Sequence, residues 1–310
     1  MTDALNVVVR FALYVDLMLL FGLSLFVLYA PKEIAWHSAG GWPLRRMLAT
    51  FAVAGVGLSV LGLFVVCAAM AGMPLMGVDR ATVAMVVTQT PAGAAWQLRL
   101  VALAIAFAAS LALPPRGSRA VVAVIALASA AALASLAWTG HGAAGEGPVG
   151  AIQLAADIVH LLAAGVWVGA LAAFGMLLWR SPARRSPDHI SLTHRALERF
   201  SAVGTLAVAA LVGTGLVNSF LLVGFANLPT LPATLYGQLL IAKLVLFAGM
   251  LVLAAANRFR LTPALAIGEG DRRAEVGALR RSLALETGAA TAILALVAWL
   301  GTLAPPLSSS

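Results

Sequence analysis

Long apolar runs dominate the pattern of this chain. Eight stretches are both apolar enough and long enough to be membrane-crossing helices: residues 5–30, 44–71, 95–113, 117–138, 150–179, 196–223, 235–257 and 282–304. A helix needs ~20 residues to span a hydrocarbon layer of ~30 Å. The runs are continuous rather than alternating, and lipid offers no partner for an unpaired backbone amide, so helices are favoured over strands. The pattern predicts an all-α, polytopic bundle of eight transmembrane helices.

Composition supports a membrane protein without a separate soluble part. Of the 310 residues, 62% are hydrophobic and 10% are charged, and the mean hydropathy is +0.98. These values lie outside the usual range of soluble globular domains. The longest gaps between the runs, near 72–94, 180–195 and 258–281, are too short for a sizeable soluble domain. We therefore expect residues 1–310 to form a single transmembrane domain.

The basic residues predict the orientation of the bundle. Sixteen of the 20 lie in or beside the odd-numbered connections: Lys32, Arg45, Arg46, Arg116, Arg119, Arg180, Arg184, Arg185, Arg195, Arg199, Arg258, Arg260, Arg272, Arg273, Arg280 and Arg281. The positive-inside rule then places these connections in the cytoplasm and both termini in the periplasm. The net charge of +8 is thus a topology signal and does not indicate nucleic-acid binding.

Two histidines are the main candidates for chemistry. His141 follows Trp138 in a glycine-rich connection, and His160 stands within the fifth apolar run, three residues after Asp157. At ~1.5 Å per residue, His160 is ~15 Å deep, where an ionisable residue usually has a function. Asp157 shares a helical face with His160 and could orient a metal-bound imidazole. The simpler alternatives are a solvated loop histidine at 141 and a purely structural interhelical bond at 160.

Three methionines form a second candidate metal site. Met70, Met73 and Met76 are spaced by three residues at the end of the second run, on the side where His141 is expected. Thioethers are soft ligands that suit Cu(I). The spacing puts them on one face only if the helix continues past Gly72, and methionine is also a common packing residue. Cys67 is the one cysteine of the chain, which excludes an internal disulfide and a multi-cysteine metal site.

Further polar residues interrupt the apolar runs. Asp16 and Lys243 could pair with each other and so neutralise two charges in the membrane. Arg10 and Arg99 are expected near the outer face, with side chains that reach toward the headgroups. Other polar residues of the helices could complete a polar path through the interior or could form structural hydrogen bonds: Tyr14, Asn218, Tyr236, Gln238 and Glu286. His37, His189 and His194 lie among the cytoplasmic arginines and are expected to be solvated.

The order of several motifs is similar to a known family. They are Gly140-His141; Asp157-Ile-Val-His160 with Trp167 and Gly169; Phe200-Ser201; Thr214-Gly215 with Asn218; Tyr236-Gly237 with Lys243; and Asn257-Arg258 with Pro263. In this succession the chain resembles the bacterial CopD/PcoD copper-resistance membrane proteins. The resemblance covers nearly the whole chain and is strongest over 138–304.

This resemblance implies a multi-pass protein of the bacterial inner membrane, surrounded by lipid, that handles copper ions. It implies movement of copper inward from the periplasm, often beside a small periplasmic copper-binding partner of the CopC type, which would here be a separate protein. The family's two histidines correspond to His141 and His160. With the candidates taken from the residues themselves, the predicted copper ligands are His141, His160, Asp157, Met70, Met73 and Met76.

Two other functions remain open at this stage. Histidines on membrane helices also serve as axial ligands of haem in redox proteins, and a Soret band would reveal such a group. The chain could also be a docking scaffold that moves no copper itself. It contains no P-loop and no hydrolase or kinase signature, so we expect no enzyme and no ATP-driven step.

Overall fold

The structure is a computed structural model that describes residues 2–31, 44–139, 147–178, 187–224, 227–262 and 272–304. Within these ranges every regular element is helical. The long helices are α1 (Thr2–Tyr29), α3 (Leu44–Ala71), α5 (Pro91–Ala112), α6 (Arg119–Ala134), α7 (Gly147–Leu178), α8 (Pro187–Val223), α9 (Leu235–Ala256) and α11 (Arg272–Leu300). Eight helical segments are long and apolar enough to cross a membrane, which confirms the predicted bundle.

The shorter elements lie at the ends of these helices. They are α4 (Arg80–Gln89), the 3-10 turns η1 (Leu75–Gly77), η2 (Ser135–Thr139) and η6 (Leu231–Ala233), and the π-helical turn η7 (Asn257–Leu261). Helix α4 was not expected from the sequence, because its ten residues are too few and too polar for a membrane span. The side chain of Asp79 caps it by accepting a hydrogen bond from the Thr82 amide at 2.8 Å.

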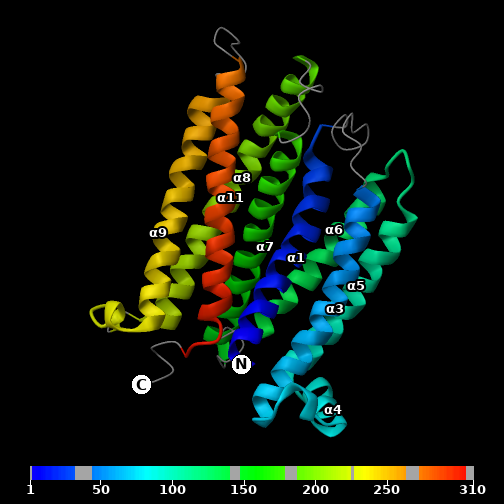
Figure 1. Ribbon diagram of the computed structural model, residues 1–310, viewed down its shortest axis with the longest axis vertical. Helices are drawn as coiled ribbons and strands as arrows, with labels where there is room; N and C mark the ends of the chain where they lie inside the picture. Colours follow the sequence, from blue (N-terminus) through cyan, green and yellow to red (C-terminus); the bar gives the residue numbers. More distant parts are fainter. Residues whose placement is uncertain are drawn as a thin grey trace.

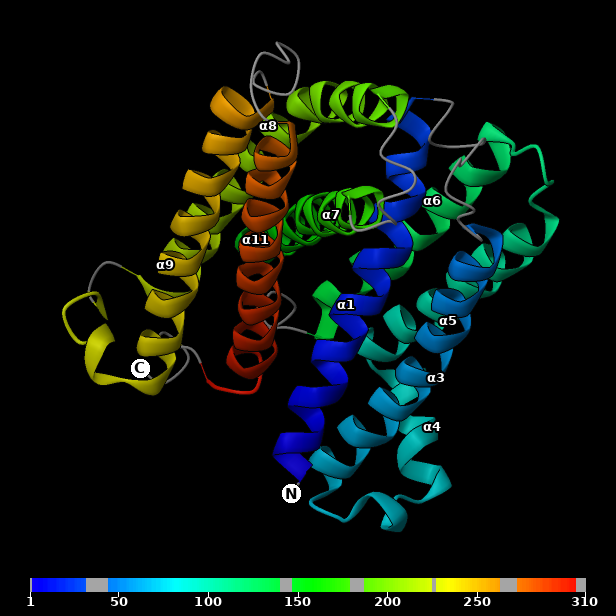
Figure 2. The same cartoon turned by 45° about the horizontal axis from the view of Figure 1, so that its top comes forward.

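Helix α1 is the centre of the bundle (Figure 1). It packs against α3, α6, α7 and α11. In α1, 67% of the most apolar 18-residue stretch is buried within the protein. In α9 the buried share is 11%, so we expect α9 to face lipid. In the rotated view of Figure 2, α3 and α5 lie together on one side of α1, and α8, α9 and α11 lie on the other.

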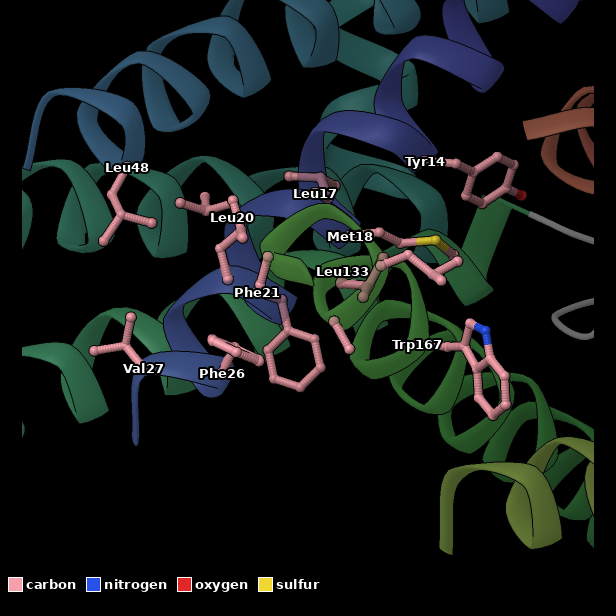
Figure 3. Close-up of a cluster of buried hydrophobic side chains, with 14 of the residues drawn as sticks. Tyr14, Leu17, Met18, Leu20, Phe21, Phe26, Val27, Leu48, Leu133 and Trp167 are labelled. Carbon is pink, nitrogen blue, oxygen red and sulfur yellow. The ribbon is translucent and has the colours of Figure 1, made fainter. Parts of the chain in front are cut away.

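The core follows from this central position. Side chains of α1, including Leu17, Leu20 and Phe26, meet Leu133 of α6 and Trp167 of α7 in one apolar cluster (Figure 3). Phe26 also packs edge-on against Phe174, with ring centroids 5.4 Å apart. Because lipid is as apolar as these side chains, close packing rather than exclusion of water holds such helices together.

Three glycines allow α1 and α7 to touch backbone to backbone. A Cβ atom built on Gly22 of α1 would lie 2.7 Å from Gly169 Cα, and one built on Gly169 would lie 2.8 Å from Gly22 O. Gly165 stands one turn before Gly169 and faces Phe21 and Leu133 at 2.9 Å from its own hypothetical Cβ. The segment Gly165-Val-Trp-Val-Gly169 is therefore a small-residue packing motif of the kind common between membrane helices.

The two ends of the bundle differ in charge. The two chain termini, α4 and η6 lie at one end, and the start of α3, the junction of α5 and α6 and the start of α11 lie at the other (Figure 1). The second end carries the described arginines Arg45, Arg46, Arg116, Arg119, Arg258, Arg260, Arg280 and Arg281. The expected segregation of basic residues is thus present. A cytoplasmic position for that end stays a prediction from the positive-inside rule.

Candidate functional site

Polar side chains of α7 and α8 contact each other inside the apolar bundle, and a charged side chain of α9 acts on them electrostatically. Asp157 and His160 are on α7, Thr214 and Asn218 on α8, and Lys243 on α9. Asn218 Nδ2 donates a hydrogen bond to Asp157 Oδ1 at 2.6 Å, and His160 Nδ1 lies 2.9 Å from Thr214 Oγ1. Asp157 and His160 therefore share the face of α7 that contacts α8, as their spacing predicted. We call these five residues, with Tyr236, the polar cluster.

The contact with Thr214 bears on which nitrogen of His160 carries hydrogen. Thr214 Oγ1 also lies 2.6 Å from the Ala210 carbonyl, and when it donates its one hydrogen there it accepts from His160. In that arrangement the proton of a neutral His160 sits on Nδ1, and the lone pair is on Nε2. In metal-binding histidines, one ring nitrogen usually donates a hydrogen bond, and the other nitrogen provides the lone pair that binds the metal.

This partner differs from the one expected. The sequence suggested that Asp157 would orient the imidazole, but the carboxylate accepts from Asn218 and the imidazole contacts Thr214. The spacing explains the result. Asp157 and His160 are three residues apart on α7, and Thr214 and Asn218 are four apart on α8, so the two helices meet through two parallel polar pairs rather than one triad.

Charge in the polar cluster is balanced within the protein. Lys243 is close enough for its charge to act on both Asp157 and His160. Tyr236, two helical turns before Lys243 on α9, is buried near Asp157. One carboxylate beside one ammonium group leaves the cluster neutral overall when His160 is neutral.

Comparison with known proteins identifies the family. A family model described as "Copper resistance protein D-like, N-terminal domain" matches residues 1–151, and one described as "Copper resistance protein D" matches residues 194–300. The chain is 41% identical over 313 residues to "Copper resistance protein D" of Pseudomonas syringae pv. tomato, an alignment that covers 100% of this chain and 99% of the relative. The chain belongs to the copper resistance protein D family.

Of two further relatives, one is named for the inner membrane and the other for copper transport. "Inner membrane protein YebZ" of Escherichia coli is 28% identical over 302 residues, or 96% of this chain and 98% of the relative. "Copper transport protein CutJ" of Bacillus subtilis is 38% identical over 130 residues, or 42% of this chain and 23% of the relative. No solved structure matches the chain significantly. The membership shows a multi-pass membrane protein of a copper-handling family.

The methionines lie apart from the polar cluster in this family member. Helix α3 ends at Ala71, because Gly72 takes a left-handed conformation with φ of 63° and the chain turns. Met70, Met73 and Met76 therefore do not share one helical face. Their side chains are 61%, 41% and 98% exposed, at the same end of the bundle as the chain termini. The other predicted ligand, His141, lies outside the described residues.

Two expectations for charged residues of the helices were wrong. Asp16 does not pair with Lys243: its Oδ2 is buried without a partner and lies where a Cβ of Gly55 on α3 would contact it at 2.8 Å. Arg99 does not extend to the surface of the bundle. It is 3% exposed, and its Nε donates to Ser135 Oγ at 2.8 Å. Both residues face helices that the sequence pattern alone cannot pair.

The described residues contain no group of three or more histidine, cysteine or acidic side chains that could hold a metal ion together. His194 Nδ1 lies 3.6 Å from the carboxylate of Glu198, 20 residues before Thr214 on α8. At ~1.5 Å per residue this separates His194 from His160 by on the order of 30 Å along the helix. Those two histidines therefore cannot bind one ion.

The charge balance of the polar cluster is testable by a double substitution. We expect Asp157→Asn and Lys243→Met each to lower the apparent Tm by the equivalent of up to about 1 kcal/mol, because the two opposite charges act on each other without a direct ion pair and both side chains are only half-buried. The double variant should regain most of this loss, since neither charge remains unpaired. Thermal unfolding in detergent measures all three, and additive losses in the double variant would contradict the balance.

Proposed function

We propose that this protein carries copper ions across the bacterial inner membrane from the periplasm, with His160 as a binding station inside the bundle. The observation that carries the proposal is the polar cluster on α7, α8 and α9 in a member of a copper-handling family. A relative named for copper transport and another named as an inner membrane protein support the transport step and the location. No covalent chemistry is required, and the protein acts as a transporter rather than an enzyme.

His160 supplies a nitrogen lone pair for the ion. Thr214 holds the imidazole through Nδ1, so Nε2 is the ligand atom for copper. Imidazole suits both copper oxidation states. Binding through one or two ligands also permits release, because an ion held by a complete set of protein ligands would leave slowly. Ligand exchange along the helices then moves the copper.

Asp157 and Lys243 set the electrostatics of that step. Asp157, held by Asn218, lowers the cost of bringing a cation into the membrane. Lys243 keeps the empty site neutral but opposes the ion when it arrives. This opposition weakens binding at His160 and favours onward movement. Asn218 Oδ1 is buried without a partner among the described atoms and offers one more oxygen beside Asp157.

The exposed methionines are proposed to collect copper at the outer surface. Met70, Met73 and Met76 stand at the end of α3 that the basic-residue distribution assigns to the periplasm. Together with His141 they would receive the ion, and a separate CopC-like periplasmic protein is the expected donor. Their exposure suits exchange with a donor, because a buried thioether could not be approached.

Uptake into liposomes tests the function directly. Purified protein is placed in proteoliposomes with a copper-sensitive dye inside, and copper is added outside under reducing or oxidising conditions. We expect copper to enter faster than into liposomes without protein. A scaffold would move none, so equal rates would contradict transport. An absorption spectrum of the same sample checks the redox alternative, since a Soret band would point to haem.

The role of the three exposed methionines can be tested by substitution. Replacing Met70, Met73 and Met76 together with leucine should raise the copper concentration needed for half-maximal uptake about 3–10-fold, because soft ligands that concentrate Cu(I) are lost. The maximal rate should change little, since His160 is untouched. Met85→Leu, at another 44% exposed methionine on α4, is the matched control. An unchanged concentration dependence would remove these methionines from the path.

A further inference from the structure

A small cavity lies between α1, α3, α4, α5 and η2, and none of the residues of the polar cluster lines it. Its volume is about 70 Å³. Most of the wall is apolar, with Val9, Leu13 and Leu63 among the lining side chains. Two arginines, Arg10 of α1 and Arg99 of α5, also line it. The cavity therefore combines a mostly apolar wall with two guanidinium groups.

Arg99 is deeply buried and only partly satisfied. Its Nε and Nη2 donate to Ser135, to Oγ at 2.8 Å and to the carbonyl at 3.3 Å. A guanidinium group has five N–H donors, and both of these acceptors are uncharged. Tyr14, which also lines the cavity, is close to Arg99. A buried cation without an opposite charge is costly, so a missing anion is the simplest completion.

Arg10 shows the same deficit. Its Nη1 donates to the Thr139 carbonyl at 3.4 Å, while its Nε is buried without a partner. Among the described residues the only ion pair is that of His194 with Glu198, so no described carboxylate pairs with either arginine. Asp16 is the acid of α1 inside the membrane, and its free oxygen lies against Gly55 instead. Two cationic groups thus line one cavity together.

We propose that this cavity binds an anionic phosphate or carboxylate group through Arg10 and Arg99. Guanidinium groups match the two oxygens of such anions with paired hydrogen bonds, and the volume admits a few water-sized groups. Asn6, Ala92 and Thr139 line the cavity near the ends of α1, α5 and η2, at the end of the bundle that carries the chain termini. Lipid headgroups lie at that depth, so the anion is either the headgroup of an acidic phospholipid or a free anion from solution.

Thermal unfolding of the full chain in nanodiscs distinguishes these sources. One set of discs contains phosphatidylcholine alone, a second adds phosphatidylglycerol, and a third is the neutral disc with inorganic phosphate. We expect phosphatidylglycerol or phosphate to raise the apparent Tm by about 2–5 °C. Arg10→Gln should lose this rise, and Arg10→Lys should keep part of it. Arg80→Gln, at an exposed arginine that begins α4, is the control and should respond as the original chain does.

Each outcome decides the proposal. A rise with phosphatidylglycerol alone identifies a lipid headgroup, and a rise with phosphate in the neutral disc identifies a free anion. Equal responses of the original chain and Arg10→Gln would overturn the proposal, because phosphate also stabilises proteins without binding at a site. It would be overturned too if neither phosphatidylglycerol nor phosphate raises the Tm of the original chain. Arg99→Lys repeats the test where Arg10→Gln fails to fold.

Discussion

Replacing Gly169 with leucine is expected to lower the apparent Tm of the purified protein by about 6–12 °C, equivalent to ~3 kcal/mol or more. The backbone of Gly22 on α1 occupies the place of the new side chain: even the Cβ would lie 2.8 Å from Gly22 O and closer still to neighbouring atoms. No rotamer relieves that contact, because it is made by Cβ itself. Helices α1 and α7 must separate, and the core around Phe26 and Trp167 must separate with them.

A second glycine gives the matched control. Gly249 on α9 is exposed, and a Cβ built there meets nothing within 4 Å. Gly249→Leu should therefore change the Tm by less than about 1 kcal/mol in equivalent free energy, or raise it slightly through better helix propensity. Unfolding in detergent, followed by circular dichroism, measures both variants. Equal losses at the two positions would show that the crossing of α1 and α7 is not specially tight.

His160→Ala is expected to reduce copper uptake into proteoliposomes at least about 10-fold, the lower bound expected for loss of a metal ligand. The reason is the loss of Nε2 as a ligand within the bundle. The fold should survive, since Thr214 keeps its bond to the Ala210 carbonyl and the pair of Asp157 with Asn218 is separate. A Tm close to that of the original chain would therefore accompany the lost uptake.

His194→Gln is the control for that variant. His194 is on the same helix as Thr214 but is paired with Glu198 near the basic end of the bundle. The His194→Gln variant should take up copper at the rate of the original chain. Uptake by His160→Ala at the original rate would exclude His160 as a copper station and leave it a structural residue that joins α7 to α8.

The number and type of the long helices were predictable because the bilayer imposes them. A span of ~20 apolar residues leaves a signal that needs no knowledge of neighbours. Helix α4 was not predictable in this way, since it lies within a connection and follows local capping by Asp79 instead of a span-length rule. The end of the predicted second run at residue 71 was right, and Gly72 explains it.

Neighbour relations were predictable only where spacing encodes them. Asp157 and His160 share a face because they are three residues apart, and the face they share contacts α8. Their partners were not predictable, since Thr214 and Asn218 become neighbours only through the packing of α7 on α8. The expected pairing of Asp16 with Lys243 was wrong for the same reason. Hydropathy shows where each helix crosses the membrane, but it does not show how the helix is rotated or which helices it packs against.

The sequence by itself determined an eight-helix membrane bundle, the segregation of its basic residues and the copper-handling family, because these depend on composition and residue order. Tertiary structure decided what the polar residues do. It joined His160 to Thr214 through Nδ1, which leaves Nε2 outside that contact, and it gathered Arg10 and Arg99 around one cavity without a described carboxylate. Helices far apart in the chain meet through side-chain shape and glycine contacts such as Gly22 with Gly169, and no one-dimensional pattern contains that information.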